Sequence, residues 1–123
     1  PVDLLNNCSE FADKKLLRNE ITKHELRNEL IDLTMQRVKE ESQFGFSEAA
    51  LTLKYLSTEE LQLRWELNIK SLGMGGLLVP GKGSEVINDV VKSFFYSKAY
   101  TIAGGSSEVQ LNIISKNILG LPS

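Results

Sequence analysis

The chain has 123 residues, of which 41% are hydrophobic and 24% are charged, an ordinary composition for one globular domain. Its formal net charge is −2 and it has no block of basic residues, so nucleic acid is not an expected partner. No apolar run reaches 18 residues, and the sequence therefore predicts no membrane span.

Cysteine and histidine are both scarce. Cys8 is the single cysteine, which excludes an internal disulfide and indicates a reducing compartment, the cytoplasm or a mitochondrial matrix if the source is eukaryotic. One cysteine and one histidine are too few for a structural zinc site, so we expect no metal. The chain starts at Pro1 without a methionine or a signal-peptide pattern, and we expect it to be a piece of a longer protein.

The first predicted elements are a short helix with a charged connection over residues 1–21, and then a long helix. Thr22 and Glu25 have the spacing of a capping box, which predicts a helix from about Lys23 to Ser42. Its expected buried stripe is formed by Leu26, Leu30, Leu33 and Val38, with Ile31 and Met35 beside them.

Ser47 is the predicted cap of a second helix that runs to Leu72. A second start at Ser57-Thr58 is possible, but the apolar spacing continues across it and favours one long helix. Gly73-Met74-Gly75-Gly76 is expected to end this helix, and residues 77–83 are expected to form a loop.

Ser84 is the predicted cap of a third helix, in which apolar residues repeat as adjacent pairs every four positions (Val86, Ile87, Val90, Val91, Phe94 and Phe95). Gly104-Gly105 follows as a hinge. Ser107 and Gln110 then have the spacing of a capping box, which predicts a last helix over Ser107–Leu119 that Gly120 and Pro122 terminate.

No stretch of the sequence has the pattern of a β-strand or a hairpin turn. Amphipathic helices joined by short connections predict an all-α fold, an up-down four-helix bundle. We expect one domain over residues 1–123, with residues 1–21 as a helix and connection and residues 22–123 as the bundle helices.

The residues alone do not indicate a catalytic constellation. His24 is predicted to be a solvated surface histidine, and Glu40-Glu41 and Glu59-Glu60 to belong to solvated faces. The elbow, residues 104–110, is either an ordinary capped helix start or an anion site, because glycines before a helix N-terminus leave backbone N–H groups open to a ligand.

The final segment, TIAGGSSEVQLNIISKNILGLPS (residues 101–123), resembles the C-terminus of acyl-CoA dehydrogenases. In one subgroup of that family a similar TIAGG(S/T)SE(I/V)Q run precedes a helix and LGLP. The preceding FYSKA is similar to a family segment that usually has arginine where Lys98 stands. The likeness extends more weakly to residues 25–37 and 51–78.

The resemblance implies a C-terminal helical domain of a flavoenzyme that removes two hydrogens from the Cα–Cβ bond of an acyl-CoA thioester, in fatty acid metabolism. It implies FAD as cofactor, an electron-transfer acceptor, and a homodimer or homotetramer. The positions that correspond to cofactor contacts are Gly73, Gly76, Gly105, Ser106 and Glu108.

A departure from the family pattern limits this interpretation. Some members carry the catalytic glutamate where this chain has Gly104, and in others the base lies on an earlier helix, so no catalytic residue is assigned here. The isolated 123 residues are therefore expected to be inactive. The alternatives are a non-catalytic partner subunit of a heteromeric dehydrogenase and a helical oligomerisation module without flavin.

Overall fold

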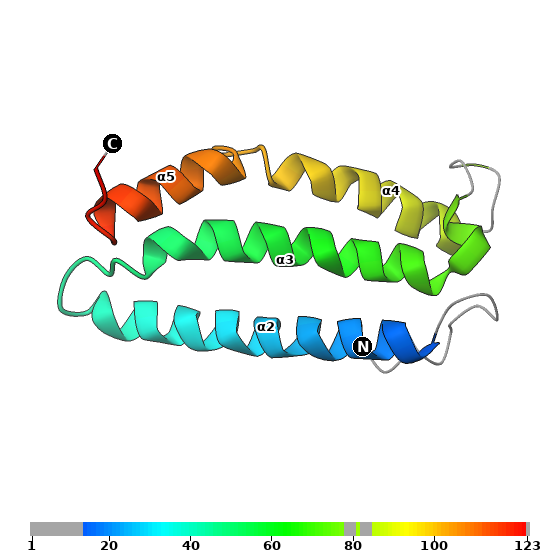
Figure 1. Ribbon diagram of the computed structural model, residues 1–123, viewed down its shortest axis with the longest axis horizontal. Coiled ribbons are helices and arrows are strands. Elements are labelled where there is room, and N and C mark those ends of the chain that lie inside the picture. Colours follow the sequence, from blue (N-terminus) through cyan, green and yellow to red (C-terminus); the bar gives the residue numbers. More distant parts are fainter. Residues whose placement is uncertain (1–13, 78–80, 82–84, 123) are drawn as a thin grey trace.

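A computed structural model of the chain describes residues 14–77, 81 and 85–122 (Figure 1). Within these residues it contains four α-helices, α2 (Lys14–Glu41), α3 (Ala50–Ser71), α4 (Glu85–Tyr100) and α5 (Ser107–Asn117), and a short 3₁₀ helix, η1 (Gly73–Leu77). The described part has no strand, and the predicted all-α fold is confirmed.

The helices lie side by side in three rows (Figure 1). α3 forms the middle row, α2 runs antiparallel to it on one side, and α4 and α5 follow each other end to end on the other side. No Cα atom of α2 lies within 8 Å of α4 or α5. α3 therefore supplies the contact surface for both outer rows, and the described helices form a flat layer.

α2 is longer at its N-terminal end than the sequence predicted. The helix already includes Lys14, and Thr22, the predicted cap, lies in its interior. The Thr22 hydroxyl donates to the carbonyl of Arg18 at 3.0 Å, a bond that hydroxyls commonly make within helices. The predicted start at Lys23 is wrong, because a capping-box spacing can also occur inside a continuous helix.

The side of α2 that packs on α3 also differs from the prediction. Leu17 and Ile21 are buried against Leu67 of α3, whereas Leu26, Leu30 and Leu33 are about 60% exposed. Successive residues of a helix are 100° apart, so these two sets lie on opposite sides of α2. The helix has two apolar stripes, and α3 covers the one that the sequence analysis did not select.

α3 is a single unbroken helix, as predicted. The hydroxyls of Ser57 and Thr58 donate back to the carbonyls of Leu53 and Lys54 within it, at 2.6 and 2.8 Å, so no new helix starts there. The predicted cap Ser47 is wrong. Its hydroxyl instead donates to the Glu41 carboxylate at the end of α2, at 2.6 Å, and closes the turn between the two helices.

The glycine run ends α3 as predicted. Gly73 has φ +55°, a left-handed conformation that favours glycine, and the chain continues into η1. α4 then packs along α3, with Val91 buried and the Lys98 ammonium donating to the Glu66 carboxylate at 2.7 Å. The helix predicted near the N-terminus, the cap at Ser84 and most of the predicted loop lie outside the described residues.

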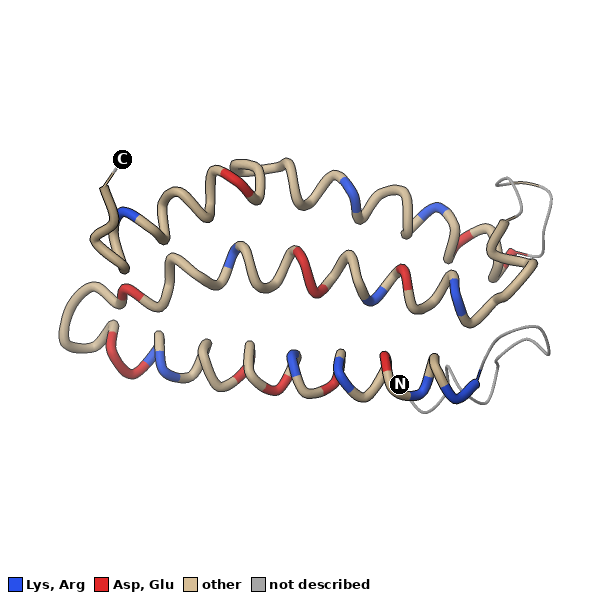
Figure 2. The backbone as a smooth tube through the Cα atoms, viewed as in Figure 1, with Lys and Arg blue, Asp and Glu red and all other residues tan. Residues whose placement is uncertain are grey.

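Charges of both signs alternate along α2 and α3, and they are sparser on the row of α4 and α5 (Figure 2). Neither sign forms a continuous patch along the backbone (Figure 2). Among the described helices, none combines the length and apolar character that a membrane crossing would need.

Candidate functional site

The elbow joins α4 to α5 through two glycines in left-handed conformations. Gly104 has φ +70° and Gly105 has φ +105°, values that side-chain-bearing residues rarely adopt. Ser106 is the N-cap of α5, and its hydroxyl accepts from the N–H of Val109 at 3.4 Å. The predicted capping box of Ser107 and Gln110 is wrong, because the cap lies one residue earlier.

Three side-chain contacts hold this turn in place. The Lys54 ammonium donates to the Gly105 carbonyl at 2.6 Å, and the Gln110 amide donates to the Gly104 carbonyl at 3.1 Å. The Ser107 hydroxyl donates to the carboxylate of Glu59. Two of these contacts tie the elbow to α3, so its backbone is braced by the middle helix.

The N-terminus of α5 already has an acidic side chain beside it. The hydroxyl of Ser106, and next the backbone N–H of Glu108 itself, lower the pKa of the Glu108 carboxyl below its ordinary value. An incoming anion would have to displace this exposed carboxylate from the positive end of the helix. The elbow is therefore better suited to receive a hydroxyl or N–H donor than a free anion.

The two predicted groups of cofactor residues lie far apart within the chain. The elbow packs beside Lys54, and Gly73 and Gly76 follow the other end of α3 (Figure 1). At 1.5 Å per helical residue, the span from Lys54 to Gly73 is roughly 28 Å. Gly105, Ser106 and Glu108 are brought together, whereas the glycine turn forms a separate location.

Close packing against α3 is sufficient to explain why position 76 of the turn is a glycine. A Cβ on Gly76 would lie 2.7 Å from the carbonyl oxygen of Ile69 and 2.9 Å from its Cγ2. η1 therefore approaches α3 so closely that only glycine fits at this position. At the elbow, a Cβ on Gly105 would lie 2.9 Å from the Gln110 amide nitrogen, while one on Gly104 would meet nothing within 4 Å.

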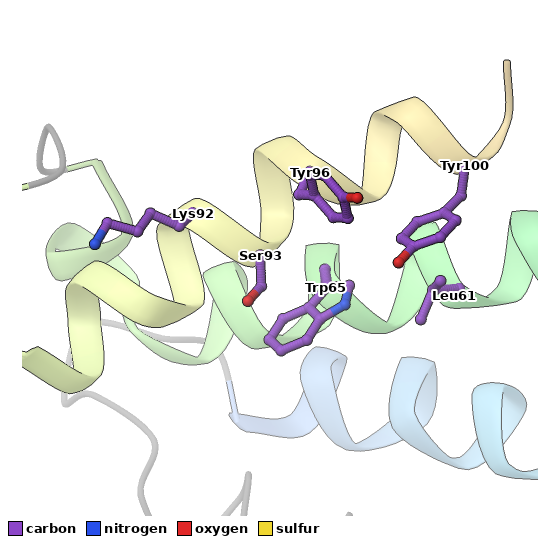
Figure 3. A pocket seen from close by; sticks show the side chains of 6 residues that line it. All are labelled: Leu61, Trp65, Lys92, Ser93, Tyr96 and Tyr100. Carbon is purple, nitrogen blue, oxygen red and sulfur yellow. The ribbon is translucent and has the colours of Figure 1, made fainter. Parts of the chain in front are cut away.

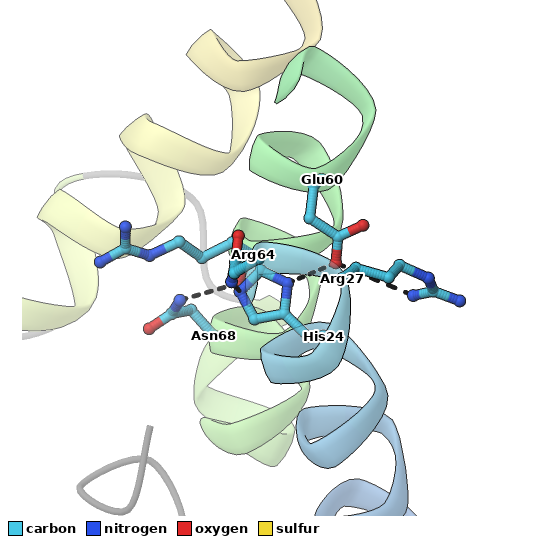
Figure 4. Close-up of polar contacts among 6 residues, drawn as sticks. His24, Arg27, Glu60, Arg64 and Asn68 are labelled. Carbon is cyan, nitrogen blue, oxygen red and sulfur yellow. Dashed lines mark hydrogen bonds and ion pairs between the residues drawn. The ribbon is translucent and has the colours of Figure 1, made fainter. Parts of the chain in front are cut away.

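A second polar cluster, missed by the sequence analysis, lies between α2 and α3 (Figure 4). His24, predicted at the surface, is buried, and its Nδ1 lies 2.6 Å from Oε1 of the equally buried Glu60. Asn28 places its amide nitrogen 3.0 Å from Nε2 of His24, and Arg27 places Nη1 3.8 Å from the same Glu60 oxygen. The solvated positions predicted for His24 and Glu60 are wrong.

These contacts explain how His24 and Glu60 tolerate burial. Nδ1 of His24 faces a carboxylate and therefore donates to Glu60, and the Asn28 side-chain amide lies within hydrogen-bond distance of Nε2. Each polar group therefore has a partner, which makes its burial tolerable. The cluster lies on the α2 side of α3, away from the elbow, and we interpret it as a joint between the two helices.

The residues that complete the elbow could not have been identified from local spacing. Lys54 is 51 residues from Gly105 in the chain, and Glu59 is 48 residues from Ser107. Both lie on α3, where a lysine and a glutamate are typical of a solvent-facing helix. Within the described residues, no group of three His, Cys, Asp or Glu side chains is placed to hold a metal ion.

Comparison with known families matches residues 6–119 to the domain described as "Acyl-CoA dehydrogenase, C-terminal domain". The matched range includes all four α-helices and the elbow. Searches of curated proteins and of solved structures gave no significant match.

Proposed function

Because the chain belongs to the acyl-CoA dehydrogenase family through its C-terminal domain, we propose that it forms the FAD-contacting and oligomer-forming part of a flavin-dependent acyl-CoA dehydrogenase. The reaction is the α,β-dehydrogenation of an acyl-CoA thioester, and the electrons leave through an electron-transfer acceptor. The elbow is the single feature that carries this proposal, since it combines the family-like segment with a braced set of polar groups.

The chemistry of the elbow supports a specific kind of contact. Ser106 and Glu108 lie at the start of α5, and the carboxylate of Glu108 is exposed and ionised. FAD carries hydroxyl groups on its ribityl and ribose parts, which can donate to such a carboxylate. We assign Gly105, Ser106 and Glu108 to hydroxyl contacts of this type, and Lys54 to holding the elbow backbone.

Gly73 and Gly76 remain proposed contacts to a different part of the cofactor or to the cofactor of a second subunit. The span of roughly 28 Å along α3 exceeds what one compact group could bridge. An arrangement in which the elbow of one subunit and the glycine turn of another meet across an interface would reconcile the two locations. This domain supplies no assigned catalytic base, since glycine at position 104 cannot abstract a proton.

The exposed apolar side chains support assembly into a homodimer or homotetramer. Leu26, Leu30 and Leu33 form a stripe on the side of α2 that α3 does not cover. Phe95 and Val86 are exposed on α4 as well. The stripe on α2 is a contiguous apolar surface, which is typical of protein interfaces. We place the protein in the cytoplasm, or in the mitochondrial matrix if the source is eukaryotic.

The proposal is tested on the parent protein that contains this domain. We expect a yellow protein whose flavin absorbance is bleached by an acyl-CoA. Ser106→Asp should reduce the flavin content, because it removes the hydroxyl assigned to the cofactor and the new carboxylate repels Glu108 from its contact position. Asn112→Asp is the matched control, because it adds the same charge to an exposed site on α5. Equal flavin loss in both variants would remove Ser106 from the site.

A non-catalytic partner subunit is the second candidate, and Gly104 is the observation that favours it. A Cβ there would meet nothing within 4 Å, so the site has room for a side chain that the chain does not supply. A colourless parent protein that copurifies with a flavin-containing paralogue would support this candidate. Flavin bleaching by acyl-CoA in the parent protein alone would exclude it.

A further inference from the structure

An open groove of about 560 Å³ runs between α3 and α4, separate from the elbow. Leu61 and Trp65 of α3 form one wall, and Lys92, Ser93, Tyr96 and Tyr100 of α4 form the other (Figure 3). The volume lies in the range of small-molecule sites, about 300–1,000 Å³.

Half of the side chains that line this groove are aromatic. The rings of Tyr96 and Tyr100 pack edge to face, with centroids 5.3 Å apart at 90°, and the Trp65 indole lies on the opposite helix (Figure 3). These three side chains and Leu61 offer flat apolar surface to a ligand. A planar ring could therefore pack against Trp65 and Tyr96 together.

The polar groups of the groove are open to a ligand. In the part of the chain that the structure describes, the Trp65 indole N–H, the Lys92 ammonium and the hydroxyls of Ser93, Tyr96 and Tyr100 have no hydrogen-bond or ion-pair partner. By contrast, Lys98, on the same helix, is paired with Glu66. The donors of this groove thus come from both walls, one from α3 and the others from α4.

The charge at the groove decides which class of ligand it favours. Aromatic faces alone would also suit a cation. Lys92, however, is the one charged residue that lines the groove in the described part of the chain, and it lies at one end (Figure 3). An ammonium at this position repels a cation and attracts an anionic group.

We propose that the groove binds a small planar aromatic anion, such as an aromatic carboxylate. Its ring packs between Trp65 and Tyr96, and its carboxylate accepts from Lys92 and Ser93. This site goes beyond the proposed dehydrogenase function, since none of the proposed FAD contacts lines it. The outcome of its test therefore does not depend on whether the protein binds flavin.

Trp65 is the single tryptophan of the chain, so its emission reports on this groove directly. The 123-residue chain is titrated with 4-nitrobenzoate and with the neutral 4-nitrobenzyl alcohol, and quenching of Trp65 is followed after inner-filter correction. We expect saturable quenching by both compounds, with about threefold to fivefold tighter binding of the carboxylate, the effect of one exposed ion pair.

Lys92→Met should remove this preference, so that the two compounds bind with equal affinity. Lys116→Met on α5 is the matched control, since it removes one exposed lysine away from the groove, and it should leave both affinities unchanged. Equal binding of acid and alcohol by the unmodified chain would overturn the proposal. A Trp65 emission that shifts when the chain is concentrated without ligand would also overturn the proposal. Such a shift would show that a second copy of the chain fills the groove.

Discussion

His24 and Glu60 face each other across the joint between α2 and α3, with Nδ1 and Oε1 2.6 Å apart and both side chains less than a tenth exposed. Each side chain is the main hydrogen-bond partner that offsets the cost of burying the other. A buried charge or donor left without its partner costs far more than the pair itself contributes. This pair therefore specifies which face of α2 packs on α3.

Removing one member of the pair should destabilise the fold strongly. His24→Leu leaves the Glu60 carboxylate buried with Arg27 as its remaining partner in the described structure, at 3.8 Å, and should lower the free energy of unfolding by about 3 kcal/mol in urea titrations. The double variant His24→Leu/Glu60→Leu should recover most of this loss, because no buried polar group remains unpaired. A double variant as unstable as the single one would contradict the role given to the pair.

A methyl group on Gly76 should disrupt the contact between η1 and α3. The added Cβ would come 2.7 Å from the backbone oxygen of Ile69, which cannot move away as a flexible side chain would. We expect Gly76→Ala to cost about 2 kcal/mol of stability.

Gly75→Ala provides the matched control for this substitution. Its Cβ would lie 3.5 Å from Cδ1 of Ile87, an ordinary van der Waals distance, and the backbone at Gly75 is not left-handed. Thermal unfolding should show a clear drop in Tm for Gly76→Ala and almost none for Gly75→Ala. Similar Tm values for the two variants would show that the close approach is not rigid.

The ion pair between Glu66 and Lys98 should make the docking of α4 on α3 sensitive to acid. The hydrogen bond from Lys98 lowers the pKa of Glu66 below its ordinary value of 4.5. A lowered carboxyl pKa means that the pair contributes stability above pH 4.5 and loses it as the pH falls through the lowered value. Both side chains are 37% exposed, so solvent screening limits the contribution to about 0.5 kcal/mol.

A double-mutant cycle with Glu66→Gln and Lys98→Met measures this contribution. Lys98 also lies 4.7 Å from the centroid of the Phe94 ring, and the cycle separates that contact from the ion pair. The coupling energy should be present at pH 7 and should decrease as the pH falls below 4.5 through the lowered pKa of Glu66. A coupling that does not change with pH down to full protonation of Glu66 would show that the carboxylate charge is not its source.

The exposed stripe of α2 should mediate self-association. Leu33→Glu places a charge within the stripe of Leu26, Leu30 and Leu33, and should weaken association about tenfold or more, because a charge does not tolerate burial in an apolar interface. Gln36→Glu adds the same charge to another exposed site of α2 and should have little effect. Light scattering across a concentration series distinguishes the two, and a monomer at all concentrations for the unmodified chain would refute the interface.

Apolar periodicity was sufficient to predict the helical fold. The pattern of paired residues in α4 and the continuous spacing through α3 predicted both helices closely, since a buried stripe requires that spacing. Capping spacings were less reliable: Thr22, Ser47 and Ser107 were all predicted as caps or capping-box residues, and all three hydroxyls donate to other acceptors. A serine or threonine three residues before a glutamate or glutamine occurs often enough by chance that helix ends need tertiary information.

The choice between the two stripes of α2 could not be made from the sequence either. Leu26, Leu30 and Leu33 form the more apolar stripe, yet the stripe that contains His24 packs on α3. The carboxylate that Glu60 supplies from the neighbouring helix helps to make a buried histidine acceptable there. The elbow depends on tertiary packing in the same way. Local sequence predicts Gly105 and Ser106 there. The contacts that Lys54 and Glu59 make with the elbow depend on how α3 packs beside it.

Within the described residues no Cα atom of α2 lies within 8 Å of α4 or α5, so the outer rows are thermodynamically linked through the middle helix. Each of them could in principle detach from α3 while the other stays docked, so the isolated layer has little means of unfolding in one step. A partner that spreads across the face of all three rows would bridge the outer helices directly. Assembly would then supply the cooperativity that the flat arrangement of a single chain does not provide.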